Sequence, residues 1–168
     1  MPKVTSLGHV GLFCNDIGVM RDFYENTLGM TVTDYSNERQ MVFLSSNPEL
    51  EHHELFLTAG RNTDAEAKII QQISFHVDSL EEVRQFHERF IADEVTIDSI
   101  VTHGNTASIY FRDPELNRLE IYYSLKDATG NPVSWPQPFR VALDIKQNDA
   151  QILKQIQDVT SKTINKPV

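Results

Sequence analysis

Cysteine is almost missing from this sequence, and so are the long apolar segments that would place it in a membrane. Cys14 is the only cysteine among 168 residues, which excludes an intrachain disulfide and a cysteine-based zinc site. No apolar run reaches the roughly 18 residues of a membrane-spanning helix, and no apolar segment of signal length follows the first methionine. We therefore expect a folded protein of the cytoplasm.

Clusters of basic residues are missing as well. The chain has 15 Lys and Arg against 24 Asp and Glu, which gives a net charge of −9. Binding to nucleic-acid phosphates or to an anionic membrane surface needs grouped lysines and arginines, and no basic run is present. The expected partners are therefore small molecules, with no nucleic acid and no membrane.

One predicted hairpin is the most informative stretch that the chain does contain. Polar and apolar residues alternate over residues 106–112 and again over residues 118–123, which is typical of two half-buried strands. Residues 113–117 combine Asp, Pro and Asn, the composition of a tight turn. A symmetric hairpin places Tyr110 directly opposite Glu120. This phenol and carboxylate are either part of a site or an ordinary contact on a solvated face.

The rest of the chain indicates two similar halves, each running strand, helix, strand, strand, strand. Asp16 and Asp78 occupy comparable positions at the two helix starts, and Ser79 with Glu82 forms a capping box. The expected strands are residues 7–14, 31–35, 40–46 and 52–59 in the first half, and residues 71–77, 95–101 and the hairpin in the second. We therefore predict an α+β fold of two paired βαβββ modules, residues 1–62 and 69–124, forming a curved sheet around a cavity.

Residues 125–168 have a different composition. Trp135 and the prolines around it predict an extended segment that cannot enter a central strand. Ile152 and Ile156 then follow helical spacing, with Asn148 as a candidate helix cap. This tail either wraps its own module or docks on a second subunit, so a homo-oligomer stays open.

The hairpin also carries a motif. Its members follow the spacing of the extradiol dioxygenase signature: His103, Ile109-Tyr110, Asp113-Pro114 and Glu120. With its two βαβββ halves, the chain over residues 5–124 resembles the vicinal oxygen chelate superfamily. That superfamily includes glyoxalase I, fosfomycin and bleomycin resistance proteins and extradiol catechol dioxygenases. The tail around Trp135 and Gln137-Pro138 is similar to that of single-domain relatives of the dioxygenases. Leu116 stands where the family usually has Gly, which predicts an altered turn.

The resemblance implies a metal site. Relatives hold the metal with a His on the first strand of each module and a Glu on the last strand, which correspond by position to His9, Gln72 and Glu120. Gln72 thus replaces one imidazole by an amide oxygen, a weaker and neutral donor. Three such ligands on one side of Fe(II) leave positions for a chelating diol and for O₂. The remaining histidines are interpreted as structural: His52, His76 and His87.

The resemblance also assigns residues to the chemistry, with one alternative left open. It implies His53 as the residue that relays protons, and His103 and Tyr110 as residues that hydrogen-bond the substrate. Because alternate strand residues face opposite ways, only one of His53 and Glu54 can point at the cavity. A site with His53 is that of a dioxygenase, whereas the set His9, Glu54, Gln72 and Glu120 is similar to the metal site of glyoxalase I.

The function expected from the resemblance is Fe(II)-dependent extradiol cleavage of a catechol-type aromatic with O₂. One alternative is a glyoxalase- or epimerase-like metalloenzyme that uses Ni(II), Co(II), Zn(II) or Mn(II). Another is a metal-free protein of the bleomycin-resistance kind that binds a small molecule. Consumption of O₂ separates the first from the second, and metal content separates both from the third.

Overall fold

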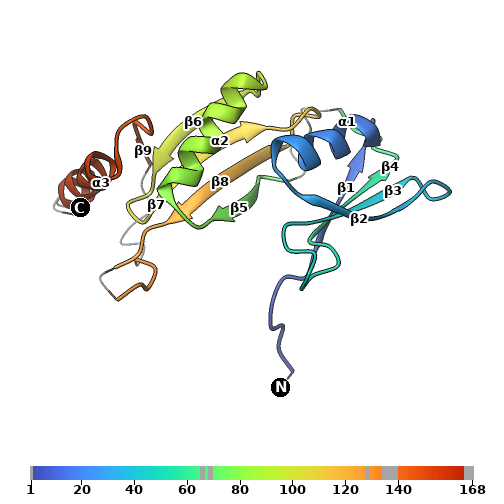
Figure 1. The fold of residues 1–168 in the computed structure, drawn as a ribbon, viewed down its shortest axis with the longest axis horizontal. Coiled ribbons are helices and arrows are strands. Elements are labelled where there is room, and N and C mark those ends of the chain that lie inside the picture. The colour runs from blue at the N-terminus through green and yellow to red at the C-terminus, as the bar shows by residue number, and fades with distance from the viewer. Residues whose placement is uncertain (1, 65–66, 68–69, 128, 134–139, 165–168) are drawn as a thin grey trace. The chain divides into compact units, whose positions relative to one another are not determined.

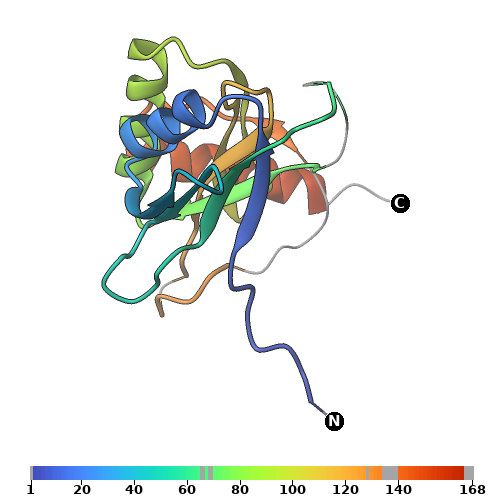
Figure 2. The same ribbon diagram turned by 90° about the vertical axis from the view of Figure 1, so that its right-hand side faces the viewer.

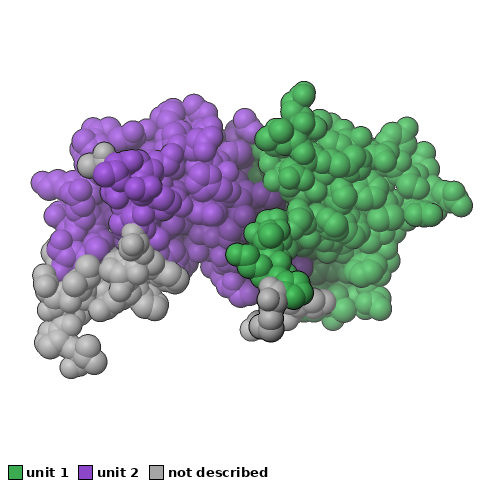
Figure 3. All heavy atoms as spheres, turned by 90° about the horizontal axis from the view of Figure 1, so that it is seen from below, with its two compact units in different colours: residues 1–67, 113–116 green, residues 68–112, 117–168 purple. Residues whose placement is uncertain are grey.

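The computed structural model describes residues 2–64, 67, 70–127, 129–133 and 140–164, and of residues 162–164 the backbone only. The chain forms two compact units. Unit 1 comprises residues 1–67 and 113–116, and unit 2 comprises residues 68–112 and 117–168 (Figure 3). None of the helices in the described ranges has both the length and the apolarity to cross a membrane.

Unit 1 is a βαβββ module with a four-stranded sheet in the order β1-β4-β3-β2 (Figure 1). Strands β1 and β4 are parallel, and the other pairs are antiparallel. Its elements are β1 (Val10–Cys14), α1 (Ile17–Asp22), the π-helical turn η1 (Phe23–Thr27), β2 (Thr31–Ser36), β3 (Met41–Ser45) and β4 (Leu55–Ala59). The predicted order is confirmed, although β1 and β4 each begin three residues later than expected. Residues 2–8 extend away from the sheet (Figures 1 and 2).

The first helix of unit 1 begins where its cap predicts. The Asp16 carboxylate accepts a hydrogen bond from the Val19 N–H at 3.0 Å, which satisfies one of the free donors at the helix start. In β1 the alternation buries Leu12 and Cys14 and leaves Phe13 exposed. The strand therefore has one face in the core of unit 1 and one outer face, which continues toward His9.

Unit 2 repeats the module and adds a strand and a helix. Its sheet has the order β5-β8-β7-β6-β9. The elements are β5 (Ile73–Val77), α2 (Leu80–Ala92), β6 (Ile97–Thr102), β7 (Thr106–Arg112), β8 (Arg118–Ser124), β9 (Val141–Ala142) and α3 (Asp149–Ile164). The capping box at α2 is confirmed, since the Glu82 N–H donates to the Ser79 hydroxyl at 3.1 Å. The α+β prediction with paired βαβββ modules is thus confirmed.

Helix α2 covers one face of the five-stranded sheet (Figures 1 and 2). The rings of Phe90 on α2 and Phe111 on β7 lie 4.3 Å apart between their centroids. Because side chains alternate along a strand, the apolar residues of β7 face α2 and Tyr110 belongs to the opposite face. The register pairs Tyr110 with Glu120, as predicted.

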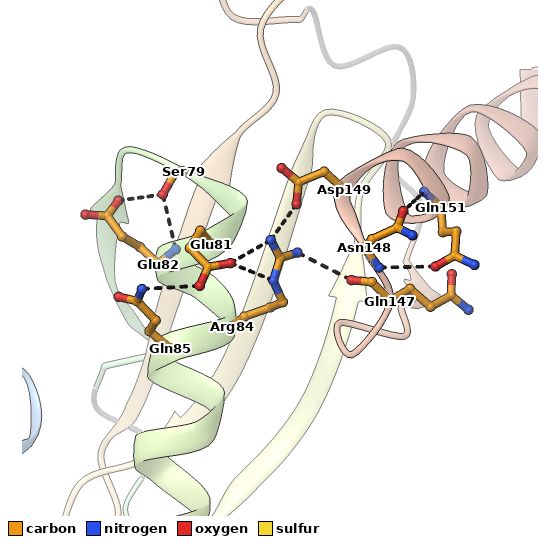
Figure 4. A network of polar contacts seen from close by, with 9 residues as sticks. All are labelled: Ser79, Glu81, Glu82, Arg84, Gln85, Gln147, Asn148, Asp149 and Gln151. Atoms are coloured by element: carbon orange, nitrogen blue, oxygen red, sulfur yellow. Dashed lines mark hydrogen bonds and ion pairs between the residues drawn. The ribbon is translucent and has the colours of Figure 1, made fainter.

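The C-terminal segment packs on unit 2 itself. Strand β9 pairs with β6, an addition that the sequence did not predict. Asn148 caps α3 by accepting from the Gln151 N–H at 3.0 Å. Arg84 on α2 contacts Glu81 at 2.8 Å and Asp149 at 2.5 Å, which ties the start of α3 to α2 (Figure 4). The predicted extended stretch around Trp135, Pro136, Gln137 and Pro138 lies outside the described residues.

The turn between β7 and β8 belongs to unit 1 and is held there by a buried carboxylate. Glu115 accepts hydrogen bonds from the N–H groups of Asn15 at 2.6 Å and Asp16 at 2.9 Å. The Arg61 guanidinium lies 3.2 Å from the same carboxylate, and the two side chains are only 7% and 8% exposed. This turn therefore fixes the loop that follows β1, as well as reversing the chain.

Leu116 in this turn has a φ of 65°. The substitution of Gly by Leu predicted an altered turn, but the backbone keeps a left-handed conformation that favours glycine. Such a conformation costs a non-glycine residue about 1–2 kcal/mol, and the Leu116 side chain is 45% exposed. We expect Leu116→Gly to raise the free energy of unfolding by about 1 kcal/mol in urea titrations. A loss of stability would show that the leucine side chain contributes more than the strain costs.

Two buried acids predict that unit 1 weakens at high pH. Burial raises the pKa of the Cys14 thiol to about 12, with the charges of Glu115 and Asp113 adding to the shift. Burial also raises the pKa of Tyr24 well above its usual value, and its hydroxyl donates to Asp113 at 3.1 Å. Below about pH 8 both groups are protonated in the folded and the unfolded chain. Above it the unfolded chain loses its protons first, so stability falls as pH rises.

We therefore expect the free energy of unfolding to decline from about pH 8 upward through Cys14 and from about pH 10 also through Tyr24, by up to about 1.4 kcal/mol per pH unit for each group. Urea unfolding at a series of alkaline pH values measures this slope. Tyr24→Phe should flatten it, whereas Tyr35→Phe should not, because Tyr35 is 65% exposed. An equal slope in both variants would contradict the role of Tyr24.

Candidate functional site

A buried carboxylate lies at the centre of the candidate site in unit 2. Glu120 on β8 is 7% exposed and is paired in register with Ser74 on the parallel strand β5. Its Oε2 atom accepts from the Ser74 hydroxyl at 2.6 Å and from the Gln72 amide at 3.0 Å. Gln72 also donates to the Ser74 hydroxyl at 2.9 Å. Two of the three predicted metal ligands, Gln72 and Glu120, are therefore in direct contact.

Tyr110 links this carboxylate to His103. Burial raises the pKa of Tyr110 to about 12, and its hydrogen bond to Glu120 and the Glu120 charge add to the shift. The hydroxyl consequently stays protonated near neutral pH. His103 Nε2 lies 3.1 Å from Tyr110 Oη. Since the single phenol hydrogen goes to Glu120, the imidazole donates in this contact.

In unit 1 the outer face near the start of β1 carries a group of rings, here called the histidine patch: His9, Phe43, His52, His53 and Phe56. The rings of His9 and His53 lie 4.5 Å apart between centroids, and Phe43 meets His53 edge-on at 5.0 Å. The Nδ1 atoms of His52 and His53 are 2.9 Å apart. Burial lowers the pKa of His53, and positive charge on His9 or His52 would lower it further. His53 is therefore a neutral imidazole at pH 7, able to accept a proton.

Glu54 has a different environment from its neighbour His53. Its carboxylate accepts from the Ser46 N–H at 2.7 Å and from the Ser46 hydroxyl at 2.5 Å. These bonds hold the segment that connects β3 to β4. Of the two residues that the sequence left as alternatives, His53 lies beside His9 and Glu54 is bound to Ser46.

The internal repeat gives the two units equivalent positions. Gly11 pairs with Phe56 on the parallel strands of unit 1, and Ser74 pairs with Glu120 on those of unit 2. A Cβ atom at position 11 would come within 2.3 Å of the Phe56 ring, so any larger residue there would have to displace that ring. His9 and Gln72 each stand two residues before these positions. Gln72 is thus the positional counterpart of His9 in the repeat.

Two residues near the site were not identified from the sequence. Ser74 orients Glu120, and only the parallel register of β5 and β8 brings the two together. Arg118 places its guanidinium 4.3 Å from the centroid of the Tyr110 ring. The strand alternation puts Arg118 on the face of Tyr110, a signal that could have pointed to it. No three His, Cys, Asp or Glu side chains in the described ranges are placed to hold a metal ion.

Comparison with solved structures finds the same fold in several proteins. The fosfomycin resistance protein FosX from Listeria monocytogenes is 22% identical, with a TM-score of 0.60, covering 73% of this chain and 96% of its own. Lactoylglutathione lyase from Agrobacterium tumefaciens is 21% identical, with a TM-score of 0.56 and the same two coverages. A glyoxalase/dioxygenase from Nostoc punctiforme is 16% identical, with a TM-score of 0.58, covering 73% and 92%.

Metal binding is on record for one of these neighbours, since another structure of the Listeria protein contains Mn(II) and a dihydroxypropylphosphonic acid. At these identities the likeness shows a shared fold. No curated protein matches the sequence. A family model does match it, over residues 6–121, which is more than half of the chain. The chain therefore belongs to the Glyoxalase/Bleomycin resistance protein/Dioxygenase superfamily.

Proposed function

We propose that this protein is an Fe(II)-dependent extradiol dioxygenase that opens the ring of a catechol-type substrate. The observation that carries the proposal is the hydrogen-bonded chain of His103, Tyr110 and Glu120 in unit 2. These three residues have the spacing of the dioxygenase signature. The contact between His9 and His53 in unit 1 supports the same reaction, because it brings a neutral imidazole next to a proposed metal ligand.

We infer that His9, Gln72 and Glu120 hold the metal. An imidazole, a carboxylate and an amide oxygen are donor types that suit divalent iron. Glu120 is already oriented by the Ser74 hydroxyl, the kind of outer contact that ligating carboxylates usually have. Gln72 donates its amide N–H to Glu120, and a half-turn of the amide group would present its oxygen instead. When bound, the metal would favour the deprotonated diol and offer a position for O₂.

The protein residues would supply proton transfer and orientation. His53 is a neutral imidazole and can accept a proton from a diol hydroxyl, then return it to the product. Tyr110 stays a phenol, so it can donate a hydrogen bond to an oxygen of the substrate if it leaves Glu120. His103 donates to Tyr110 and thereby fixes the direction of the phenol hydrogen. This division of roles needs one base and one donor, and we assign them to His53 and Tyr110.

Anaerobic loading with Fe(II), followed by metal quantification and O₂ uptake with a panel of catechols, tests the proposal. Stoichiometric iron, O₂ uptake and a yellow ring-opened product are expected. His53→Phe should keep the iron and lose turnover, whereas His87→Gln on α2 should keep both. Bound metal without O₂ uptake would exclude a dioxygenase, and a chain that binds no metal would be a small-molecule-binding protein.

A second candidate is a glyoxalase- or epimerase-like metalloenzyme that uses Ni(II), Co(II), Zn(II) or Mn(II). Gln72 favours its Mn(II) form, because carbonyl oxygen donors suit Mn(II), whereas imidazole suits Fe, Ni and Zn. Against it, Glu54 is engaged with Ser46, and the glyoxalase-like ligand set needs that carboxylate. The Fe(II) experiment separates the two candidates, since isomerisation consumes no O₂.

The amide at position 72 gives a prediction of its own. If Gln72 ligates the metal weakly, Gln72→His should tighten Fe(II) binding by about tenfold or more, because imidazole is the stronger donor. Competition against a chelator measures this affinity. Gln71→His is the matched control, since Gln71 is an exposed neighbour with the same side chain. Equal affinities in Gln72→His and the wild type would remove Gln72 from the metal site.

A further inference from the structure

Two arginines flank the ring of Tyr110 on the face of unit 2 that carries the candidate site. The Cζ atom of Arg118 lies 4.3 Å from the ring centroid, and that of Arg140 lies 5.9 Å from it. Arg140 comes just before β9 and donates to the Ser99 hydroxyl, and Ser99 is paired with Tyr110 across β6 and β7. The sheet thus brings two guanidinium groups to the phenol that we place next to the substrate.

The positive charge of these arginines is only partly balanced. Asp98 contacts Arg112 Nη2 at 2.7 Å and Arg118 Nε at 3.8 Å, so one carboxylate serves two guanidinium groups. With Arg140, three guanidinium groups lie near two carboxylates, Asp98 and the Glu120 that hydrogen-bonds Tyr110, in a chain whose net charge is −9. A local excess of positive charge in an acidic protein is a feature of anion-binding sites.

The position of the two arginines near the Tyr110 ring is compatible with binding an anion. Attraction between a guanidinium and an aromatic ring does not use up the N–H donors of the guanidinium. Those donors match the two oxygens of a carboxylate. Arg140 is exposed, and in the described part of the chain its hydrogen bond is to the Ser99 hydroxyl rather than to a carboxylate. Arg118 holds Asp98 only at the longer of the two distances.

We propose that Arg118 and Arg140 bind a carboxylate carried by the substrate, so that the protein selects acidic catechols over neutral ones. The catechol part of this inference rests on the proposed function, whereas the anion binding does not require turnover. The sequence places these arginines twenty-two residues apart, on β8 and before β9, and only the addition of β9 to β6 brings them to one ring.

Calorimetric titration with protocatechuate and its methyl ester tests the inference on the full chain, both metal-free and loaded anaerobically with Fe(II). The wild type is expected to bind the acid about tenfold or more tightly than the ester. A hydrogen bond between charged groups typically changes an affinity by about this factor. Arg140→Gln should lose most of this ratio, and Arg140→Lys should keep part of it. Arg89→Gln is the matched control, because Arg89 lies 5.3 Å from the Phe86 ring on α2, and it should keep the full ratio.

The outcomes separate this inference from the proposed function. Equal affinities for acid and ester in the wild type would overturn it, and so would a ratio that Arg140→Gln leaves unchanged. A preference for the acid without O₂ uptake would keep the anion site and remove the dioxygenase function. O₂ uptake with no preference for the acid would keep the dioxygenase function and remove the anion site.

Discussion

Glu115→Gln is expected to lower the free energy of unfolding by about 3–5 kcal/mol, the usual cost of breaking a buried ion pair. The Glu115 carboxylate accepts from the backbone of Asn15 and Asp16 and faces Arg61, and both charged side chains are almost fully buried. An amide would remove the negative charge of the buried pair with Arg61 and would turn an N–H group toward donors. Urea unfolding followed by circular dichroism measures the loss.

Glu38→Gln is the control for this prediction. Glu38 is exposed in the connection between β2 and β3, so its substitution should change stability by less than about 0.5 kcal/mol. Arg61→Gln combined with Glu115→Gln should cost less than the sum of the single changes, since the two charges form one pair. A loss below about 1 kcal/mol in Glu115→Gln would contradict the prediction that the charge of this carboxylate stabilises the fold.

The sequence predicted those features that depend on neighbours in the chain. The pairing of Tyr110 with Glu120 follows from alternation and a symmetric turn, and the structure has that register. The cap at Asp16 and the capping box at Ser79 follow from spacing over a single helical turn. Because these interactions are local, side-chain type and spacing are enough to specify them.

Features that depend on distant residues could not be predicted in the same way. Glu115 looks like a turn residue in the sequence, and its partners Asn15 and Asp16 stand about a hundred positions earlier. Glu54 hydrogen-bonds Ser46 at the other end of the β3–β4 connection, which bears on the alternative between His53 and Glu54. No residue pattern in the sequence marks either contact. The same is true of β9, a two-residue strand too short to show alternation.

The candidate site shows both kinds of feature in one place. His103, Tyr110 and Glu120 were found because they lie within a single hairpin with a recognisable spacing. Ser74 and Arg140 contribute through strands β5 and β6, whose neighbours are set by topology. The motif therefore points to the proposed site, and the sheet supplies the residues that contact Glu120 and Tyr110.

Glu120→Gln is expected to have the largest effect on function. Among the three proposed ligands Glu120 is the only charged one, and a neutral amide would leave the metal with no negative donor. Changes of residues that merely orient a ligand cost about 10–100-fold in metal affinity, so loss of this ligand should cost at least about 100-fold. Chelator competition with Fe(II) measures the affinity, and O₂ uptake with catechols should fall below detection.

Tyr110→Phe is the matched comparison, because it removes a hydrogen-bonding partner of Glu120 and leaves the carboxylate in place. It should bind Fe(II) within about tenfold of the wild type and turn over more slowly, since the phenol donor is lost. Urea unfolding of both variants separates weak binding from a damaged fold, which matters because Glu120 is buried. Wild-type iron affinity in a folded Glu120→Gln protein would exclude Glu120 as a ligand and leave Ser74, Gln72 and Tyr110 as a polar network of unit 2.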